Sequence, residues 1–295
     1  MKRSLFYFWC LALFASTILQ GQDKFLSIDG VSFRYQISGD GAPVVLIHGW
    51  GNSLESWHYL FPELADEYTV VRYDRRGFGK SGGIPDLSLD PIDLKNLMNS
   101  LNIEKPVVIG HSQGAESALR FALAFPELLG KLVLFGCSAP EGFGLAWNGP
   151  DALPANLAQI AREEGLDSMR TLFRGHPIGK GAVAGSEGLE IMRSMFYSYD
   201  ARDLLNTTPS VNATPPADIS RLSEIAVPTL VITGELEMPY FKIVADALAY
   251  GIKNAERVVV AGGGHSVHLQ QPAQFNYALK QFISKNSPLE TNDDK

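Results

Sequence analysis

The stretch KPVVIGHSQGAESALRFALAFPE, residues 105–127, joins an apolar strand-like run to a helix-like run through the five residues GHSQG at 110–114. Gly110 and Gly114 permit a turn too tight for a side chain at either position. A single G-x-S-x-G match is weak evidence in a chain with 28 glycines, but the strand before it and the helix after it make it specific. The stretch therefore predicts a strand, a sharp turn and a helix, with the hydroxyl of Ser112 held above the edge of a sheet.

Short apolar strands alternate with helices on both sides of this turn. Strands are predicted at 25–28, 31–38, 42–49, 68–74, 105–112, 131–138, 227–235 and 256–264, and helices at 54–66, 90–103, 113–127, 239–252 and 271–285. The pair Asp29-Gly30 between the first two strands indicates a hairpin. Most of the later strands are continuous runs of Val, Leu and Ile, which is typical of parallel strands buried on both faces. The fold class is therefore α/β, with a mostly parallel eight-stranded sheet and helices on both of its faces.

The alternation lapses once, from residue 139 to residue 222, where the sequence is irregular and contains Pro, Gly and helical patches. Two independent domains would leave the last two strands too little chain to fold alone. We therefore predict one core, formed by residues 23–138 and 223–287, that carries an inserted helical cap at 139–222. The last residues, 288–295, are expected to be a disordered tail.

The N-terminus has the layout of a secretory signal peptide, which we predict at residues 1–22. Lys2 and Arg3 precede an apolar run at 5–19, which is too short to span a bilayer comfortably. The mature protein is therefore expected to be secreted or periplasmic, with a retained membrane anchor as the alternative. Cleavage would remove Cys10 and leave Cys137 as the last cysteine, so no internal disulfide is possible.

Composition narrows the classes of partner. Hydrophobic residues make up 45% of the chain and charged residues 19%, which is ordinary for a folded protein with a sizeable core. A formal net charge of −7 makes nucleic acid an improbable partner. No Cys/His cluster has the spacing of metal ligands, and no G-x-G-x-x-G follows a strand, so we expect neither a metal nor a cofactor. The oligomeric state stays open.

Several motifs together resemble the α/β-hydrolase fold superfamily from about residue 25 to residue 285. The matching pieces, in the order and spacing of that superfamily, are HGWGNSLESW from His48, YDRRGFGKSG from Tyr73, GHSQG from Gly110, PTLVITGELE from Pro228 and GGGHSVHLQQP from Gly262. The resemblance implies an α/β-hydrolase fold in which GHSQG is the nucleophile elbow. It also implies that Arg75 and Arg76 brace the site and take no part in the chemistry.

A serine hydroxyl is a poor nucleophile at neutral pH and needs a base beside it. By the resemblance that base is His265, which follows the last strand, and His268 is a less favoured alternative. The imidazole needs a carboxylate to hold its tautomer. The superfamily usually has Asp at the position that Glu237 occupies here, so Glu237 is the expected acid, and Glu235 and Glu141 stay open as alternatives.

Acyl transfer also needs backbone N–H groups to meet the oxyanion that forms. The elbow offers the N–H of Gln113, and the resemblance implies the N–H of Trp50 as the second donor of the oxyanion hole. Both would face the substrate from loops rich in glycine.

Serine as the nucleophile indicates acyl chemistry, and the sequence predicts a secreted hydrolase of carboxylic esters with a small, apolar, ester-like substrate. Opening of lactones, cleavage of amides or peptides, perhydrolysis of the cofactor-free haloperoxidase kind and C–C bond hydrolysis stay open as alternatives. So does a receptor that binds ligands without turnover. The cap is rich in apolar and aromatic side chains that either line the substrate pocket or form the core of the cap: Phe143, Trp147, Met169, Phe173, Met192, Met195, Phe196, Tyr197 and Tyr199.

Overall fold

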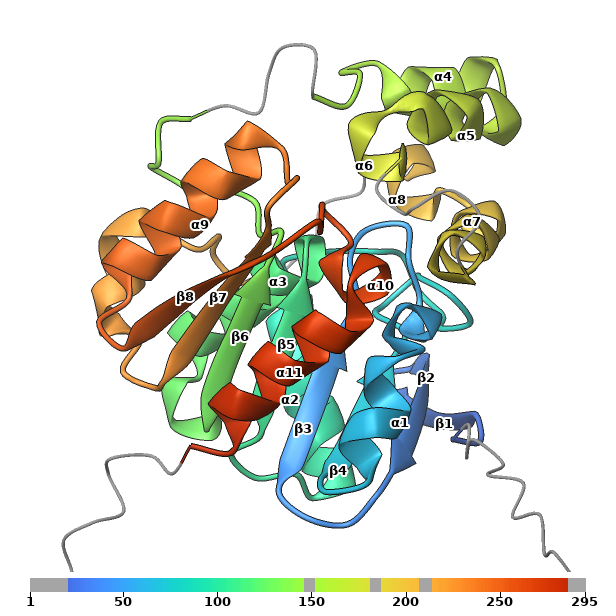
Figure 1. The fold of residues 1–295 in the computed structure, drawn as a ribbon. Helices are drawn as coiled ribbons and strands as arrows, with labels where there is room; N and C mark the ends of the chain where they lie inside the picture. The colour runs from blue at the N-terminus through green and yellow to red at the C-terminus, as the bar shows by residue number, and fades with distance from the viewer. Residues whose placement is uncertain (1–20, 146–151, 181–186, 207–213, 286–295) are drawn as a thin grey trace, which may run out of the picture.

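The computed structural model describes residues 21–145, 152–180, 187–206 and 214–285 (Figure 1). Nearly all of the expected signal peptide, the expected tail at 288–295 and Trp147 lie outside the described residues. No helix in the described ranges is long and apolar enough to cross a bilayer.

One eight-stranded sheet runs through the molecule in the order β1-β2-β4-β3-β5-β6-β7-β8. The strands are β1 (Lys24–Ile28), β2 (Val31–Ser38), β3 (Pro43–Ile47), β4 (Thr69–Tyr73), β5 (Val107–His111), β6 (Lys131–Phe135), β7 (Thr229–Gly234) and β8 (Ala255–Val260). β2 pairs antiparallel with both β1 and β4, and every other pair is parallel. The predicted fold class, an α/β-hydrolase fold with a mostly parallel sheet of eight strands, is confirmed.

The hairpin between β1 and β2 turns at Asp29 and Gly30, as predicted. Both residues have positive φ, 49° and 78°, which matches the twist of a two-residue hairpin. The turn places Ile28 opposite Val31.

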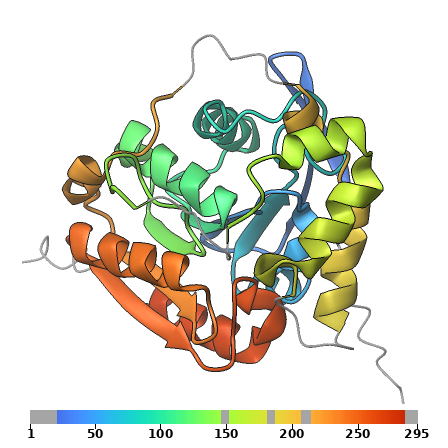
Figure 2. The same ribbon diagram turned by 90° about the horizontal axis from the view of Figure 1, so that it is seen from above.

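Helices cover both faces of the sheet (Figures 1 and 2). One face packs against α2 (Asp90–Leu101), α3 (Gln113–Ala124) and α9 (Pro239–Gly251), and the other packs against α1 (Leu60–Ala65) and α11 (Pro272–Ile283). The side chains of β3, β5 and β6 alternate between the two apolar cores, so these central strands are buried on both faces. Their carboxyl ends, where loops can carry functional groups, meet at one edge of the sheet.

The turn at GHSQG is a strained elbow between β5 and α3. Ser112 has φ 54° and ψ −122°, a conformation that L residues rarely adopt. A Cβ on Gly110 would lie 2.6 Å from the Cα of Ala115, and a Cβ on Gly114 would lie 2.8 Å from the carbonyl carbon of Ile47. Glycine is therefore required at both positions, because helix α3 passes directly over the ends of β5 and β3.

Five α-helices are described in the residues of the inserted segment that the structure covers, and they lie above the carboxyl ends of the strands, on the side away from α9 (Figures 1 and 2). They are α4 (Leu157–Glu163), α5 (Leu166–Gly175), α6 (Pro177–Lys180), α7 (Glu187–Ser198) and α8 (Arg202–Leu205). The two ends of the insertion meet where Glu141 bridges to Asp218. The N–H of Glu141 donates to the carbonyl of Ala217 at 2.7 Å, and the carbonyl of Glu141 accepts from the N–H of Ile219 at 3.0 Å. This neck returns the chain to the core close to the point where it left.

Replacement of Gly110 by Ala should lower the free energy of unfolding by about 2 kcal/mol or more, because overpacking against fixed backbone typically costs 1–3 kcal/mol. Gly175, at the end of α5, is the matched control, since a Cβ there would meet nothing within 4 Å. Gly175→Ala should change stability by no more than about 0.5 kcal/mol. Urea titration of both variants would check this, and equal stability of the two would contradict the steric argument.

Candidate active site

Ser112, His265 and Glu237 form a continuous hydrogen-bonded row at the carboxyl edge of the sheet. The Ser112 Oγ lies 3.1 Å from His265 Nε2, and His265 Nδ1 lies 2.9 Å from Glu237 Oε2. A carboxylate can only accept a hydrogen bond, so Nδ1 carries the proton and Nε2 is free to accept from the serine hydroxyl. This arrangement can make the hydroxyl of Ser112 nucleophilic.

The loops that follow β7 and β8 hold the carboxylate and the imidazole together. Glu237 is 4% exposed, and its Oε1 accepts a 2.8 Å hydrogen bond from the backbone N–H of Met238. The loops are tied to each other by a 2.7 Å hydrogen bond from the N–H of Leu236 to the carbonyl of Gly263. The His265 ring packs against Phe241 of α9, with 4.5 Å between ring centroids. The packing of these two buried loops therefore positions both the carboxylate of Glu237 and the imidazole of His265.

The alternatives left open by the sequence lie elsewhere. Glu235 is exposed, and its carboxylate accepts a hydrogen bond from the N–H of Gly262. Glu141 is exposed in the neck of the insertion. His268 is buried in α10 (Val267–Gln270), where it packs against the rings of Trp57 and Phe135. The structure thus brings Glu237 and His265 to Ser112, and it brings none of these three there.

The two expected oxyanion donors border the same space as Ser112. Gln113 is the first residue of α3, so its N–H has no acceptor within the helix. Trp50 follows Gly49, where a Cβ would lie 3.0 Å from the Cβ of Ser112, so this loop runs closely past the serine. Trp50 and Gln113 both line the pocket that contains Ser112.

Buried polar side chains brace these two loops. His48 Nδ1–H donates to the carbonyl of Gly49 at 2.8 Å, and its Nε2 accepts from the N–H of Arg75 at 3.0 Å. Arg75 pairs with buried Asp90 and donates to the side chain of Gln113 at 2.9 Å. Burial lowers the pKa of His48 to about 3, so its ring stays neutral. Arg75 therefore supports the elbow and does not face substrate.

Ser112, His265 and Glu237 are the candidate catalytic triad. Ser112 and His265 line a cavity of about 380 Å³ between the core and the insertion. Its wall on the insertion side is apolar and includes Leu153, Leu157, Phe173, Ile178, Met192 and Phe196. Two carboxylates, those of Glu116 and Asp203, also line it, and Glu116 pairs with Arg120 at 2.8 Å. No Lys or Arg stands among the described residues of the lining. The cavity suits a largely apolar substrate.

Some of the apolar residues singled out in the insertion take one of the two expected roles, which are lining the pocket and forming a core, and others take neither. Phe173, Met192 and Phe196 line the cavity. Met169 and Tyr199 are buried in a separate core that the insertion forms with Phe78. The others do neither: Met195 lines a second pocket, Tyr197 is exposed and Phe143 packs on the main core.

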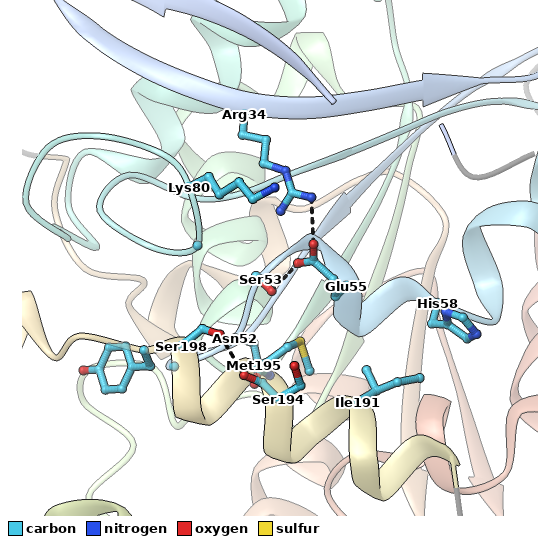
Figure 3. Close-up of a pocket in the computed structure, with 13 residues that line it drawn as sticks. Arg34, Asn52, Ser53, Glu55, His58, Lys80, Ile191, Ser194, Met195 and Ser198 are labelled. Carbon is cyan, nitrogen blue, oxygen red and sulfur yellow. Dashed lines mark hydrogen bonds and ion pairs between the residues drawn. The ribbon is translucent and has the colours of Figure 1, made fainter. Parts of the chain in front are cut away.

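The second pocket, of about 290 Å³, lies between α7 and the segment after β3 (Figure 3). Ile191, Ser194, Met195 and Ser198 form its helical wall, and Asn52 is shared with the cavity at the triad. Its charged groups are already paired, since Arg34 contacts Glu55 at 2.7 Å and Lys80 contacts Asp23 at 2.9 Å. We assign no ligand to it.

Two further histidines are buried behind His265. His111 donates Nε2–H to the carbonyl of His265 at 3.1 Å and stacks on Phe135. Burial, with a smaller contribution from His265, lowers the pKa of His268 to about 3. Burial also holds the pKa of His111 well below its ordinary value. Both rings are therefore neutral at physiological pH.

Comparisons with known proteins agree with the observed fold. Residues 44–278 match the model of the alpha/beta hydrolase family. The chain is 31% identical over 279 residues to a 2-hydroxy-6-oxononadienedioate/2-hydroxy-6-oxononatrienedioate hydrolase of Paraburkholderia xenovorans, which covers 88% of this chain and 95% of that relative. Among solved structures, it is similar to the esterase EaEST of Exiguobacterium antarcticum (TM-score 0.76, 21% identity, 90% of this chain and 100% of that one). It is also similar to a thermophilic esterase of Thermogutta terrifontis (TM-score 0.69, 25% identity, 89% and 98%).

The chain belongs to the alpha/beta hydrolase family and is an enzyme of that class. The resemblance inferred from its motifs is confirmed.

Sequence reasoning missed three residues around the site: Asp203, Phe241 and Asp90. Asp203 contacts Trp50 across 153 positions of sequence, and no motif surrounds it. Phe241 lies on α9, where an apolar residue in the sequence indicates only that it belongs to the hydrophobic core. Asp90 was visible only as the start of a helix, although an acidic residue near an Arg-rich loop could have indicated the pairing.

His268 should make the protein less stable in acid. Its folded pKa lies below the ordinary value of 6.5, so the unfolded state takes up a proton that the folded state does not, and stability falls as pH drops from about 6.5 toward 3. In His268→Phe, the loss of unfolding free energy between pH 7 and pH 5 should be about 2 kcal/mol smaller than in the wild type. Urea titrations at the two pH values would measure it.

A comparison at pH 8, where histidine is neutral in both states, isolates the change in packing that the same variant causes. An identical pH dependence in variant and wild type would show that His268 is not held neutral.

Proposed function

We propose that this enzyme is a serine hydrolase that cleaves carboxylic esters through an acyl-enzyme on Ser112. The observation that carries the proposal is the row from Ser112 Oγ through the imidazole of His265 to the buried carboxylate of Glu237, with separations of 3.1 Å and 2.9 Å. Ser112 and His265 line a largely apolar cavity that Trp50 and Gln113 also line.

In the proposed reaction the Ser112 oxygen attacks the ester carbonyl while His265 Nε2 takes the hydroxyl proton. The N–H groups of Trp50 and Gln113 meet the negative charge on the carbonyl oxygen. The imidazolium then returns its proton to the departing alcohol, which leaves the acyl group on Ser112. Water, activated by His265 in the same way, releases the acid and restores the serine. Glu237 stabilises the imidazolium in both halves.

The lining of the cavity supports a neutral substrate. A dianion would meet the carboxylate of Asp203 and find no Lys or Arg among the described lining residues to compensate it. The carbonyl of an apolar ester needs only the backbone donors. Esters of apolar acids are therefore the leading substrate class.

C–C bond hydrolysis is the second candidate, because the relative from Paraburkholderia xenovorans is named for a 2-hydroxy-6-oxo-dienedioate substrate. The same triad can serve either reaction, so the two candidates differ in the groups that hold the substrate rather than in the nucleophile.

A fluorophosphonate probe and a substrate panel test the proposal together. The probe should label the wild type and fail to label Ser112→Ala. Purified enzyme should hydrolyse p-nitrophenyl esters, with kcat/KM higher for neutral acyl groups than for those ending in a carboxylate. The panel includes lactones, aminoacyl amides and a 2-hydroxy-6-oxo-dienoate.

Labelling with turnover of the dienoate alone would replace ester cleavage by C–C hydrolysis. An unlabelled Ser112 together with an inert panel would favour a receptor on this fold.

Glu237→Gln should lower kcat by about 10⁴-fold, since an amide in place of the triad acid stabilises the wrong imidazole tautomer. Folding should be retained, because the side chains are nearly equal in size. Steady-state kinetics and thermal unfolding would measure both effects.

Glu235→Gln is the matched control, two residues away and on the exposed side of the same loop. Its kcat should stay within about 2-fold of the wild type, as for a surface change away from the site. The opposite ranking of the two variants would reassign the acid.

A further inference from the structure

The indole of Trp50 is held by the insertion, whereas its backbone belongs to the core. Its ring lies 5.6 Å from Phe173, 6.2 Å from Phe196 and 5.1 Å from Tyr199, measured between centroids. Its Nε1–H donates a 2.6 Å hydrogen bond to Asp203 Oδ2. These contacts come from α5, α7, the residue that follows α7, and α8, all of which lie above the sheet (Figure 1).

Asp203 joins these contacts into one unit. Its second carboxylate oxygen accepts a hydrogen bond from the Tyr199 hydroxyl, and no Lys or Arg pairs with it in the described part of the chain. Bonds of neutral donors to a carboxylate are stronger than bonds between neutral groups. Burial beside this carboxylate raises the pKa of Tyr199 well above its ordinary value, so its hydroxyl remains a donor.

The backbone of Trp50 needs such a restraint. Gly49 and Gly51 flank it, and glycines leave a peptide free to rotate. Gly49 runs too close to Ser112 to carry a side chain without displacement, and Gly51 has φ 68°. Neither neighbour has a side chain that could lock the peptide in one orientation. On the core side, the carbonyl of the Gly49–Trp50 peptide accepts a hydrogen bond from His48 Nδ1–H at 2.8 Å. The side chain of Trp50 is the second anchor of this peptide, on the side of the insertion.

We propose that Asp203 is a positioning residue for the oxyanion hole: through the indole of Trp50 it acts together with His48 to fix the direction of the Trp50 N–H, and so couples the seating of the insertion to transition-state stabilisation. The inference rests on the proposed function of the triad. In this proposal Asp203 does more than hold the insertion in place, because the loss of its carboxylate slows the chemical step.

The test uses Asp203→Leu, which fills a similar volume and accepts no hydrogen bond. With p-nitrophenyl acetate, kcat should fall by about 10- to 100-fold, less than the 10²–10³-fold loss typical of removing an oxyanion donor outright. KM should change by less than about 3-fold, because this small ester makes few contacts with the insertion. The affinity for an arylboronic acid, which forms a tetrahedral adduct on Ser112, should fall in parallel with kcat/KM.

A double-mutant cycle links the effect to Trp50. Trp50→Phe keeps the backbone N–H and an aromatic ring but loses the Nε1–H donor. It should reproduce the loss seen in Asp203→Leu, and the double variant should be no worse than either single variant. Additive losses would show that Asp203 does not act through the indole.

Two control variants separate positioning from simple stability. Asp203→Asn keeps an amide oxygen that can accept from Trp50, so it should recover most of kcat. Asp167→Leu makes the same replacement on α5, where the side chain is 93% exposed and pairs with Arg170, and it should leave kcat unchanged. A normal kcat and normal boronate affinity in Asp203→Leu would overturn the proposal, as would a change confined to KM.

The rate of phosphonylation by a fluorophosphonate gives a readout that does not depend on ester turnover. Ser112 Oγ bonds to phosphorus, fluoride leaves, His265 takes the serine proton, and the phosphoryl oxygen gains charge in the hole. A slow rate in Asp203→Leu beside a fast wild type supports the positioning role even if the wild type cleaves no ester. Equal rates in the two proteins refute that role and leave the proposed function intact.

Discussion

The close approach of helix α3 to the ends of β5 and β3 is the constraint on which the rest of this structure depends. Backbone atoms of Ala115 and Ile47 occupy the space that side chains would need at Gly110 and Gly114. The chain must therefore turn at once after β5, and Ser112 takes a φ of 54°. That strain is maintained because two apolar cores hold the strands and helices on either side. The serine is consequently presented above the sheet, at the start of a helix.

The proposed chemistry at Ser112 depends on a buried carboxylate beside His265 and on neutral imidazoles around that residue. Glu237 is the buried carboxylate that faces His265, and a backbone N–H satisfies its other oxygen. His48, His111 and His268 lie behind or beside the site, and burial keeps each of them uncharged. A positive charge on any of these rings would repel, and so destabilise, the imidazolium that the proposed reaction forms on His265. These three rings therefore add no positive charge beside His265.

The insertion both lines the cavity at Ser112 and contacts Trp50, a residue of the proposed oxyanion hole. Its aromatic and aliphatic side chains form the upper wall of the cavity, while Asp203 and its neighbours hold the indole of Trp50. The relative from Paraburkholderia xenovorans is named for a dicarboxylate substrate, whereas the described lining here presents carboxylates and no Lys or Arg. Members of one family can keep a triad and change the groups that select the substrate, so likeness of fold does not choose among esters, lactones and diketones.

Local physics made the framework readable from the sequence alone. Hydrophobic periodicity predicted the eight strands and their helices, and the spacing of two glycines about Ser112 predicted the elbow, because both depend on neighbours within a few residues. The resemblance to the superfamily, together with its place after the last strand, indicated His265 as the base. The resemblance favoured Glu237 but left Glu235 and Glu141 open, since the choice depends on which way each side chain points once two loops have packed. The contact between Trp50 and Asp203 spans 153 positions and has no local signature. Only the tertiary structure decides such contacts, because side-chain direction and the meeting of distant segments arise from packing, which no short-range pattern encodes.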